Sequence, residues 1–264
     1  MKTVYWVKGH GMPVIFIHGA FVDSSMWDRQ VSYFSKNYKV ITYDLRGHGK
    51  TQGKAGEYSF DAYVQDLDSL IDKTCAGQKP VICGLSLGGM IAQAYAARYS
   101  DKISGLIVAD SAVTLTLTWW DRIMKLLFPE WVMVLSLRMT GVKSFSRLSF
   151  FLGKITRGRK WLGKEHTYKY INKQMLMQEK EAWINTYRVI YAFRKQKLFN
   201  ISVPTLVIIG EYEPASLYKH AEVLKREIKD CQVQVIYDSG HIPCLDQPDH
   251  FNKVVEIFCE KIHK

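Results

Sequence analysis

The sequence predicts an α/β fold in which a mainly parallel sheet is flanked by helices. Short β-rich runs alternate with longer helical patterns at both ends of the chain, and this alternation stops between residues 112 and 198, where helical periodicity continues alone. A chain of 264 residues with 47% hydrophobic side chains can bury one large core. We therefore expect a single core made of residues 1–111 and 199–264, with a helical cap inserted at residues 112–198.

Strands are expected where short runs rich in Val, Ile and Leu lie between turn residues. Such runs occupy residues 14–17, 40–43, 80–83, 103–110, 205–209 and 233–236. Helices are expected at residues 59–74, 87–99, 217–228 and 251–262, and in the first of these the apolar side chains recur with helical spacing. This order is typical of parallel strands joined by crossover helices.

Several functional classes are disfavoured by motif content. The amino terminus lacks the apolar core and cleavage site of a secretory signal, which favours a cytoplasmic location. Five cysteines without a C-x-x-C pair argue against a disulfide framework and a structural zinc site. The G-K-T sequence at residues 49–51 lacks the first glycine of a phosphate-binding loop, because position 44 is Asp. We expect neither a metal nor a cofactor.

The net charge of +11 is concentrated in the predicted cap. Residues 112–198 contain 17 Lys and Arg against 5 Asp and Glu, whereas the rest of the chain contains 19 against 20. No helix-turn-helix, zinc finger or aromatic RNA-binding motif accompanies this charge, so nucleic acid is not an expected partner. A basic surface for anionic substrates, for lipid headgroups in a peripheral membrane contact, or for a protein partner fits it better.

The sequence Gly-Leu-Ser-Leu-Gly at residues 84–88 lies between a predicted strand and a predicted helix. In this strand–turn–helix context G-x-S-x-G presents a serine nucleophile, here Ser86, on a sharp turn that needs small neighbours. The amides at the start of the following helix, including that of Leu87, would point to a developing oxyanion. The alternative interpretation is a serine in an ordinary turn between a strand and a helix.

Five ordered blocks of the sequence resemble the α/β-hydrolase family, specifically its smaller single-cap esterase, haloperoxidase and peptidase-like members. The blocks are His18-Gly19 with Trp27 downstream, residues 44–49, residues 84–89, residues 210–214 and residues 239–241. Together they span the whole chain outside the predicted cap. The resemblance implies that Ala20, the residue after the His-Gly pair, supplies a second oxyanion amide, and that His241 is the catalytic base.

The acid that would complete a triad departs from the family pattern. The family most often has Asp at the position of Glu213, which precedes His241 by 28 residues. Glu serves the same purpose, because the requirement is a carboxylate that fixes the imidazole tautomer. Asp110, at the end of a predicted strand, remains the alternative acid. Asp238 is interpreted as a solvated turn residue.

The aromatic side chains of the predicted cap allow two interpretations. They either pack the cap on the sheet or line an apolar substrate pocket above Ser86. The candidate pocket residues are Phe21, Trp119, Trp120, Phe128, Trp131 and Met133. The expected function is a serine hydrolase, in particular a carboxylesterase acting on small or acyl-chain esters through an acyl-enzyme. The alternatives are thioester, lipid, amide or peptide, C–C bond or perhydrolase chemistry, or ligand binding with little turnover.

Overall fold

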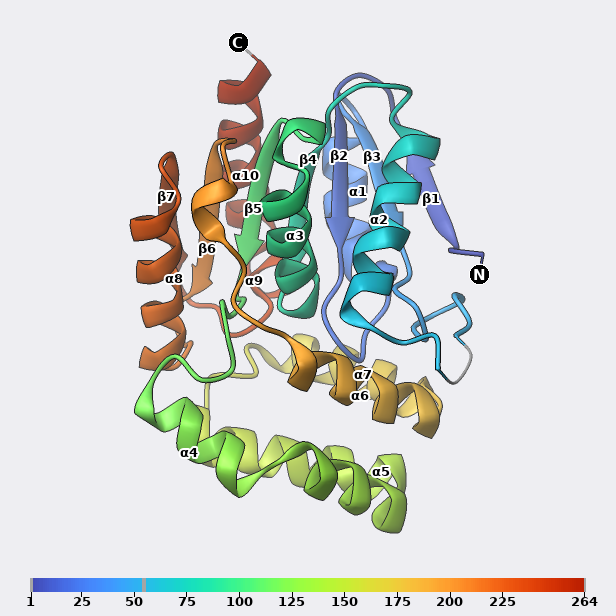
Figure 1. Ribbon diagram of the computed structural model, residues 1–264, viewed down its shortest axis with the longest axis vertical. Helices are drawn as coiled ribbons and strands as arrows, with labels where there is room; N and C mark the ends of the chain where they lie inside the picture. Colours follow the sequence, from blue (N-terminus) through green and yellow to red (C-terminus); the bar gives the residue numbers. More distant parts are fainter. Residues whose placement is uncertain (1, 54–55, 264) are drawn as a thin grey trace.

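A seven-stranded sheet forms the centre of the computed structural model, which describes residues 2–53 and 56–263 (Figure 1). Its strand order is β1-β3-β2-β4-β5-β6-β7, and only β1 runs antiparallel to its neighbour. The fold class predicted from the sequence is therefore confirmed. The strands are β1 (Tyr5–Lys8), β2 (Pro13–Ile17), β3 (Lys39–Tyr43), β4 (Val81–Leu85), β5 (Gly105–Ala109), β6 (Thr205–Gly210) and β7 (Cys231–Ile236).

Helices cover both faces of this sheet, because alternate strand residues point to opposite sides. On β2, for example, Ile15 and Ile17 belong to one buried cluster, while Val14 and Phe16 belong to the other. The first cluster includes side chains of α2 (Phe60–Thr74), α3 (Leu87–Arg98) and α8 (Ala215–Glu227). The second includes side chains of α1 (Asp28–Phe34), α9 (Pro243–Asp246) and α10 (Pro248–His263).

The sequence did not predict three elements of the core, β1, α1 and the four-residue helix α9. β1 is an edge strand of four residues with largely exposed side chains, so it carries no run of buried apolar residues. α1 has seven residues, which is too short for helical periodicity to stand out. Three short 3₁₀ helices, η1 (Ser24–Trp27), η2 (Ser100–Lys102) and η3 (Leu198–Asn200), also occur in the described residues.

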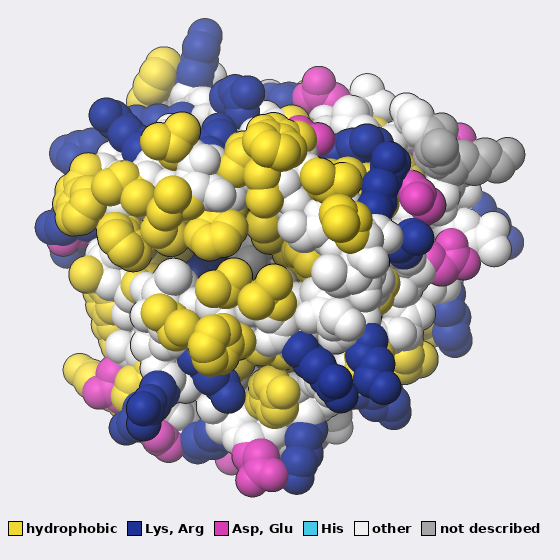
Figure 2. All heavy atoms as spheres, turned by 90° about the horizontal axis from the view of Figure 1, so that it is seen from below, with side chains coloured by type: hydrophobic (Ala, Val, Ile, Leu, Met, Phe, Trp, Pro, Cys, Tyr) yellow, Lys and Arg dark blue, Asp and Glu magenta, His cyan; other side chains and the backbone are white. Residues whose placement is uncertain are grey.

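Four helices between β5 and β6 lie against the edge of the sheet at which the parallel strands end (Figure 1). They are α4 (Trp119–Leu127), α5 (Glu130–Arg157), α6 (Glu165–Met177) and α7 (Lys180–Ala192). The predicted limits of this insertion, residues 112–198, stay a prediction. Seen from outside, the layer presents many apolar and basic side chains (Figure 2). Among the described residues, no helix combines the length and the apolar character needed to cross a membrane.

The longest of these helices, α5, is bent. Gly141 has φ 72° and ψ 168°, which interrupts the helical backbone and separates two helical segments. This conformation is open almost exclusively to glycine, because other residues would be strained there. The bend lets α5 bury Leu137 before it and Phe145 after it.

Candidate active site

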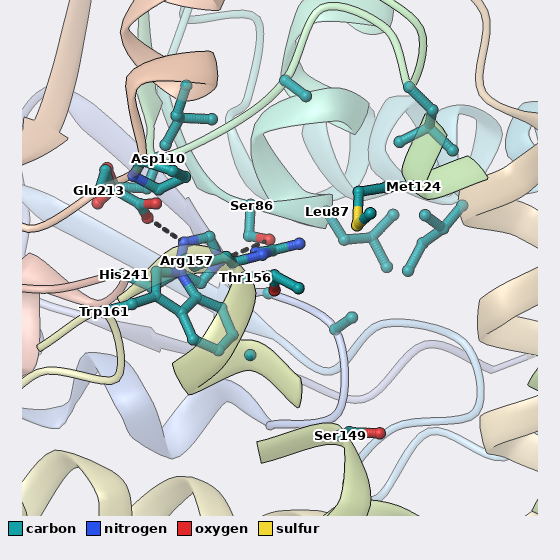
Figure 3. Close-up of a pocket in the computed structure, with 18 of the residues that line it drawn as sticks. Ser86, Leu87, Asp110, Met124, Ser149, Thr156, Arg157, Trp161, Glu213 and His241 are labelled. Carbon is teal, nitrogen blue, oxygen red and sulfur yellow. Dashed lines mark hydrogen bonds and ion pairs between the residues drawn. The ribbon is translucent and has the colours of Figure 1, made fainter. Parts of the chain in front are cut away.

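The predicted site residues follow the carboxyl ends of different strands and meet at one edge of the sheet (Figure 3). Ser86 follows β4, Asp110 follows β5, Glu213 follows β6 and His241 follows β7. Ligands in open parallel sheets are generally bound at this edge, where loops from neighbouring strands converge. Residues separated by up to 155 positions in the sequence are thereby brought into hydrogen-bonding distance.

Ser86 lies on a strained turn between β4 and α3. Its backbone has φ 53° and ψ −113°, outside the regions that a non-glycine residue ordinarily occupies. The turn depends on its glycines: a Cβ on Gly84 would collide with the carbonyl oxygen of Gly88, and one on Gly88 would collide with that of Ile17. The Ser86 amide donates to Ala109 O at 2.9 Å, and the Ser111 hydroxyl donates to Ser86 O at 2.7 Å. These bonds hold the strained residue in place.

His241 links Ser86 to Glu213. Its Nε2 lies 3.1 Å from Ser86 Oγ, and its Nδ1 is hydrogen-bonded to Glu213 Oε1 (Figure 3). The Glu213 side chain is almost fully buried, whereas that of His241 is 21% exposed. A carboxylate on Nδ1 fixes the tautomer that leaves Nε2 free to accept a proton. The arrangement is thus able to remove a proton from the serine hydroxyl.

Asp110, the alternative acid, lies nearby but makes different contacts. Its Oδ1 accepts a hydrogen bond from the Gly210 amide at 2.9 Å, while its buried Oδ2 has no partner among the described residues. Within that part of the chain, no hydrogen bond joins Asp110 to His241. Burial, reinforced by the charge of Glu213, raises the pKa of Asp110 well above its usual value. The geometry therefore favours Glu213 as the partner of His241.

The loop that carries His241 is held by residues that the sequence did not point to. Asp246 accepts hydrogen bonds from the Gly240 amide at 2.7 Å and from the Lys164 amide at 2.9 Å. Trp161 accepts one from the His241 amide at 2.9 Å, and its ring centroid lies 5.6 Å from that of the imidazole. Neither residue belongs to a recognisable motif, so only the packing of the helical layer against the β7 loop identifies them.

Ala20 and Leu87 line the cavity beside Ser86. In the ranges covered by the structure, no backbone hydrogen bond uses either amide, so both are available to an incoming oxygen. The Ala20 loop is anchored by His18, whose Nδ1 donates to Gly19 O at 2.7 Å and whose Nε2 accepts from the Leu45 amide at 2.9 Å. Burial lowers the pKa of His18 to about 4, so this anchor is neutral at physiological pH.

A cavity of about 500 Å³ opens above Ser86 and is lined mainly by apolar side chains. Four of the predicted pocket residues, Phe21, Trp120, Phe128 and Met133, line it. The prediction was wrong for Trp119 and Trp131, which are 69% and 68% exposed and point to solvent. Helical periodicity identifies an apolar residue but not the side of the helix that meets the core, and α4 and α5 have apolar residues on both sides.

Polar residues that belong to no recognisable sequence motif also line the cavity. Lys125 of α4 and Arg157 of α5 contribute positive charge to its wall, and Arg157 points into it (Figure 3). His220 accepts from the Val113 amide at 3.1 Å and faces Asp121 at 3.6 Å. In the described ranges, no group of three or more His, Cys, Asp or Glu side chains is arranged to hold a metal ion.

The sheet, the serine turn and the convergent loops define a hydrolase of the α/β class. A family model described as alpha/beta hydrolase fold matches residues 12–248, and the chain belongs to this family. It is 26% identical to 3-oxoadipate enol-lactonase 2 of Acinetobacter baylyi over 254 residues, which covers 95% of this chain and 89% of the relative.

Solved structures give the same result. A thermophilic esterase from Thermogutta terrifontis superposes with a TM-score of 0.83 at 25% identity, covering 99% of this chain and 94% of the esterase. MenH from S. aureus superposes with a TM-score of 0.87 at 23% identity, covering 98% of this chain and 99% of MenH, and at this identity it supports the fold alone. The protein is thus an α/β-hydrolase with esterase and lactonase neighbours.

Proposed function

We propose that the protein hydrolyses carboxylic esters through an acyl-enzyme on Ser86. The observation that carries the proposal is the continuous hydrogen-bonded chain from Glu213 through His241 to Ser86 Oγ, at the floor of an apolar cavity. The names of the enol-lactonase and esterase relatives support ester substrates, including cyclic ones. A serine hydrolase of the carboxylesterase type is the function that accounts for all of these features.

In the proposed reaction, His241 Nε2 takes the Ser86 proton as Oγ attacks the ester carbonyl carbon. The amides of Ala20 and Leu87 stabilise the negative charge on the carbonyl oxygen. The tetrahedral intermediate then collapses, and His241 gives its proton to the departing alkoxide. A water molecule attacks the acyl-enzyme by the same route in reverse, releasing the acid and restoring Ser86. Glu213 orients His241 and stabilises its protonated form throughout.

The test of this proposal combines covalent labelling with turnover. We expect a fluorophosphonate probe to label the protein rapidly at Ser86 and p-nitrophenyl acyl esters to be hydrolysed. Ser86→Ala should abolish labelling and lower kcat by roughly 10⁴-fold or more, because the nucleophile is lost. Ser144→Ala, which removes an exposed serine hydroxyl of α5, is the matched control and should still be labelled. Slow labelling without turnover would instead indicate a ligand-binding protein that keeps the hydrolase fold.

The charge on the cavity wall extends the proposal to the substrate. Lys125 and Arg157 line the cavity, and in the described ranges neither forms an ion pair with a carboxylate. We therefore expect negatively charged esters to be preferred over neutral ones. The kcat/KM of the charged esters should decrease as the ionic strength rises from about 0.01 M to 0.15 M. Salt screens the attraction between the cavity cations and an approaching anionic substrate. A neutral ester of the same length is the control, and an equal response of both esters would contradict the expectation.

A further inference from the structure

The outer side of α4 and α5 exposes large apolar side chains to solvent, and we call it the α4–α5 face. Six of its residues are more than 60% exposed: Trp119, Leu126, Trp131, Met139, Phe151 and Ile155. Figure 2 looks onto this side of the molecule and shows apolar side chains gathered around a hollow. Soluble monomers rarely expose a contiguous patch of this kind unless it is an interaction site.

These side chains remain largely accessible to solvent in the folded chain. α4 contains no buried residue, although all of its side chains except Asp121, Arg122 and Lys125 are apolar. α5 packs inward through Val134 and Leu137, while Leu135 and Met139, which follow them in sequence, are 50% and 78% exposed. The outward residues therefore leave a second apolar surface without a partner in the chain.

Cations without acidic partners accompany the apolar residues. Arg138, Lys143, Arg147 and Lys154 are exposed on α5, and in the ranges that the structure covers none of them forms an ion pair. Glu130, the acidic residue of α5, lies 3.5 Å from Arg188 of α7. The face therefore combines exposed apolar side chains with uncompensated positive charge.

We propose that the α4–α5 face docks on a lipid bilayer that contains anionic headgroups. Amphipathic helices with Trp, Phe and Leu beside Lys and Arg bind at this interface, because the apolar side chains enter the acyl boundary while the cations meet lipid phosphates. A second copy fits less well, because a twofold interface would bring the same cations of both copies together. Lysine is also depleted in protein–protein interfaces.

The position of the cavity agrees with a lipid surface. Trp120, Lys125, Thr156 and Arg157 belong to α4 and α5 and line the cavity above Ser86. Trp120 is at the same time 38% exposed, so the cavity wall is continuous with the α4–α5 face. Docking would thus bring the cavity to the lipid. The docking itself does not depend on the proposed hydrolysis.

Vesicle cosedimentation of the full chain tests this proposal. The protein should sediment with vesicles of phosphatidylcholine mixed with phosphatidylglycerol, and much less with phosphatidylcholine alone. Leu126→Ser and Met139→Ser should each weaken binding about tenfold, because one buried aliphatic side chain is lost from the lipid contact. Phe199→Ser is the matched control, since Phe199 is 73% exposed on η3, beside α3 and α8, and should leave binding unchanged.

Further readouts separate docking from folding and from catalysis. Ser86→Ala should bind vesicles as the wild type does, so loss of activity and loss of docking are measured independently. Circular dichroism should show the same helix content for each variant, because the substituted residues are exposed. Absence of binding to anionic vesicles, or an equal loss in Phe199→Ser, would overturn the proposal. Self-association that disappears in Leu126→Ser, without vesicle binding, would assign the face to a second copy instead.

Discussion

Two buried carboxyl groups at the candidate site have different environments. Glu213 contacts the imidazole of His241. Among the described residues, the Asp110 carboxyl accepts a hydrogen bond from the Gly210 amide and retains one oxygen without a partner. Two like charges in one buried site disfavour each other. Burial, reinforced by the charge of Glu213, raises the pKa of Asp110 well above its usual value, so this carboxyl holds a proton more readily than an exposed one. The polar contacts of each residue, rather than its sequence position, thus separate the two candidate acids.

This difference predicts opposite results for two conservative substitutions. Glu213→Gln should lower kcat by roughly 10³- to 10⁴-fold with little change in substrate binding, because the imidazole loses its charge partner and its tautomer. Asp110→Asn should change kcat by no more than about threefold, because an amide oxygen still accepts from Gly210. Steady-state kinetics with one p-nitrophenyl ester measures both. If the Glu213 variant turned over normally and the Asp110 variant did not, the acid would be Asp110.

At the scale of an element, α5 shows how one glycine sets the shape of the cavity wall. The bend at Gly141 joins a segment that contributes Met133 to a segment that contributes Phe150 and Arg157. A straight helix would direct one of these segments away from the cavity. No atom lies within 4 Å of a Cβ placed on Gly141, so backbone conformation, and not space, requires glycine there.

Gly141→Ala should therefore destabilise the protein without creating a steric clash. The expected loss is roughly 1–3 kcal/mol of unfolding free energy, the usual cost of holding a non-glycine residue in this conformation. Urea denaturation measures the loss, and kcat/KM reports the altered cavity wall. Ser144→Ala, at an exposed helical position on α5, is the control and should be neutral or slightly stabilising. Equal free energies of unfolding for the two variants would contradict the requirement for glycine at the bend.

At the scale of the whole molecule, buried neutral histidines connect the sheet to the loops at its active edge. His18 follows β2, and its ring centroid lies 5.3 Å from that of His48 in the loop after β3. Burial lowers the pKa of His18 to about 4 and, together with the neighbouring His18 ring, that of His48 to about 3. In the unfolded chain these histidines take up a proton below the ordinary histidine pKa of 6.5, whereas in the folded state they remain neutral at that pH.

This resistance predicts acid sensitivity in a defined range. The contribution of His18 to the free energy of unfolding is fully present above pH 6.5 and is lost as the pH falls towards 4. A pKa shift of this size corresponds to a loss of roughly 3 kcal/mol. Urea unfolding at several pH values measures the slope. His48→Phe keeps a ring and removes one titrating group, so stability should depend less on pH. His10→Gln, at an exposed histidine, should leave the slope unchanged, and an equal effect of both would contradict this account.

The sequence by itself determined the features that depend on local patterns. Apolar periodicity located six of the seven strands and the longer helices of the core, and the glycines around Ser86 marked the sharp turn after β4. The resemblance to α/β-hydrolases pointed to His241 and Glu213, which the structure places in contact. A short edge strand and two short helices carried too few residues for a pattern, so β1, α1 and α9 were missed.

Tertiary structure decided which side of each helix meets the core and which distant groups meet one another. Trp119 and Trp120 are adjacent residues of the same type, so the sequence does not distinguish them. In the structure Trp119 is exposed to solvent, whereas Trp120 lines the cavity. Trp161, Asp246 and Arg157 reach the site through packing between α5, α6 and the β7 loop. The physical reason is that the free energy of burial depends on contacts between segments far apart in the chain, which no local pattern records.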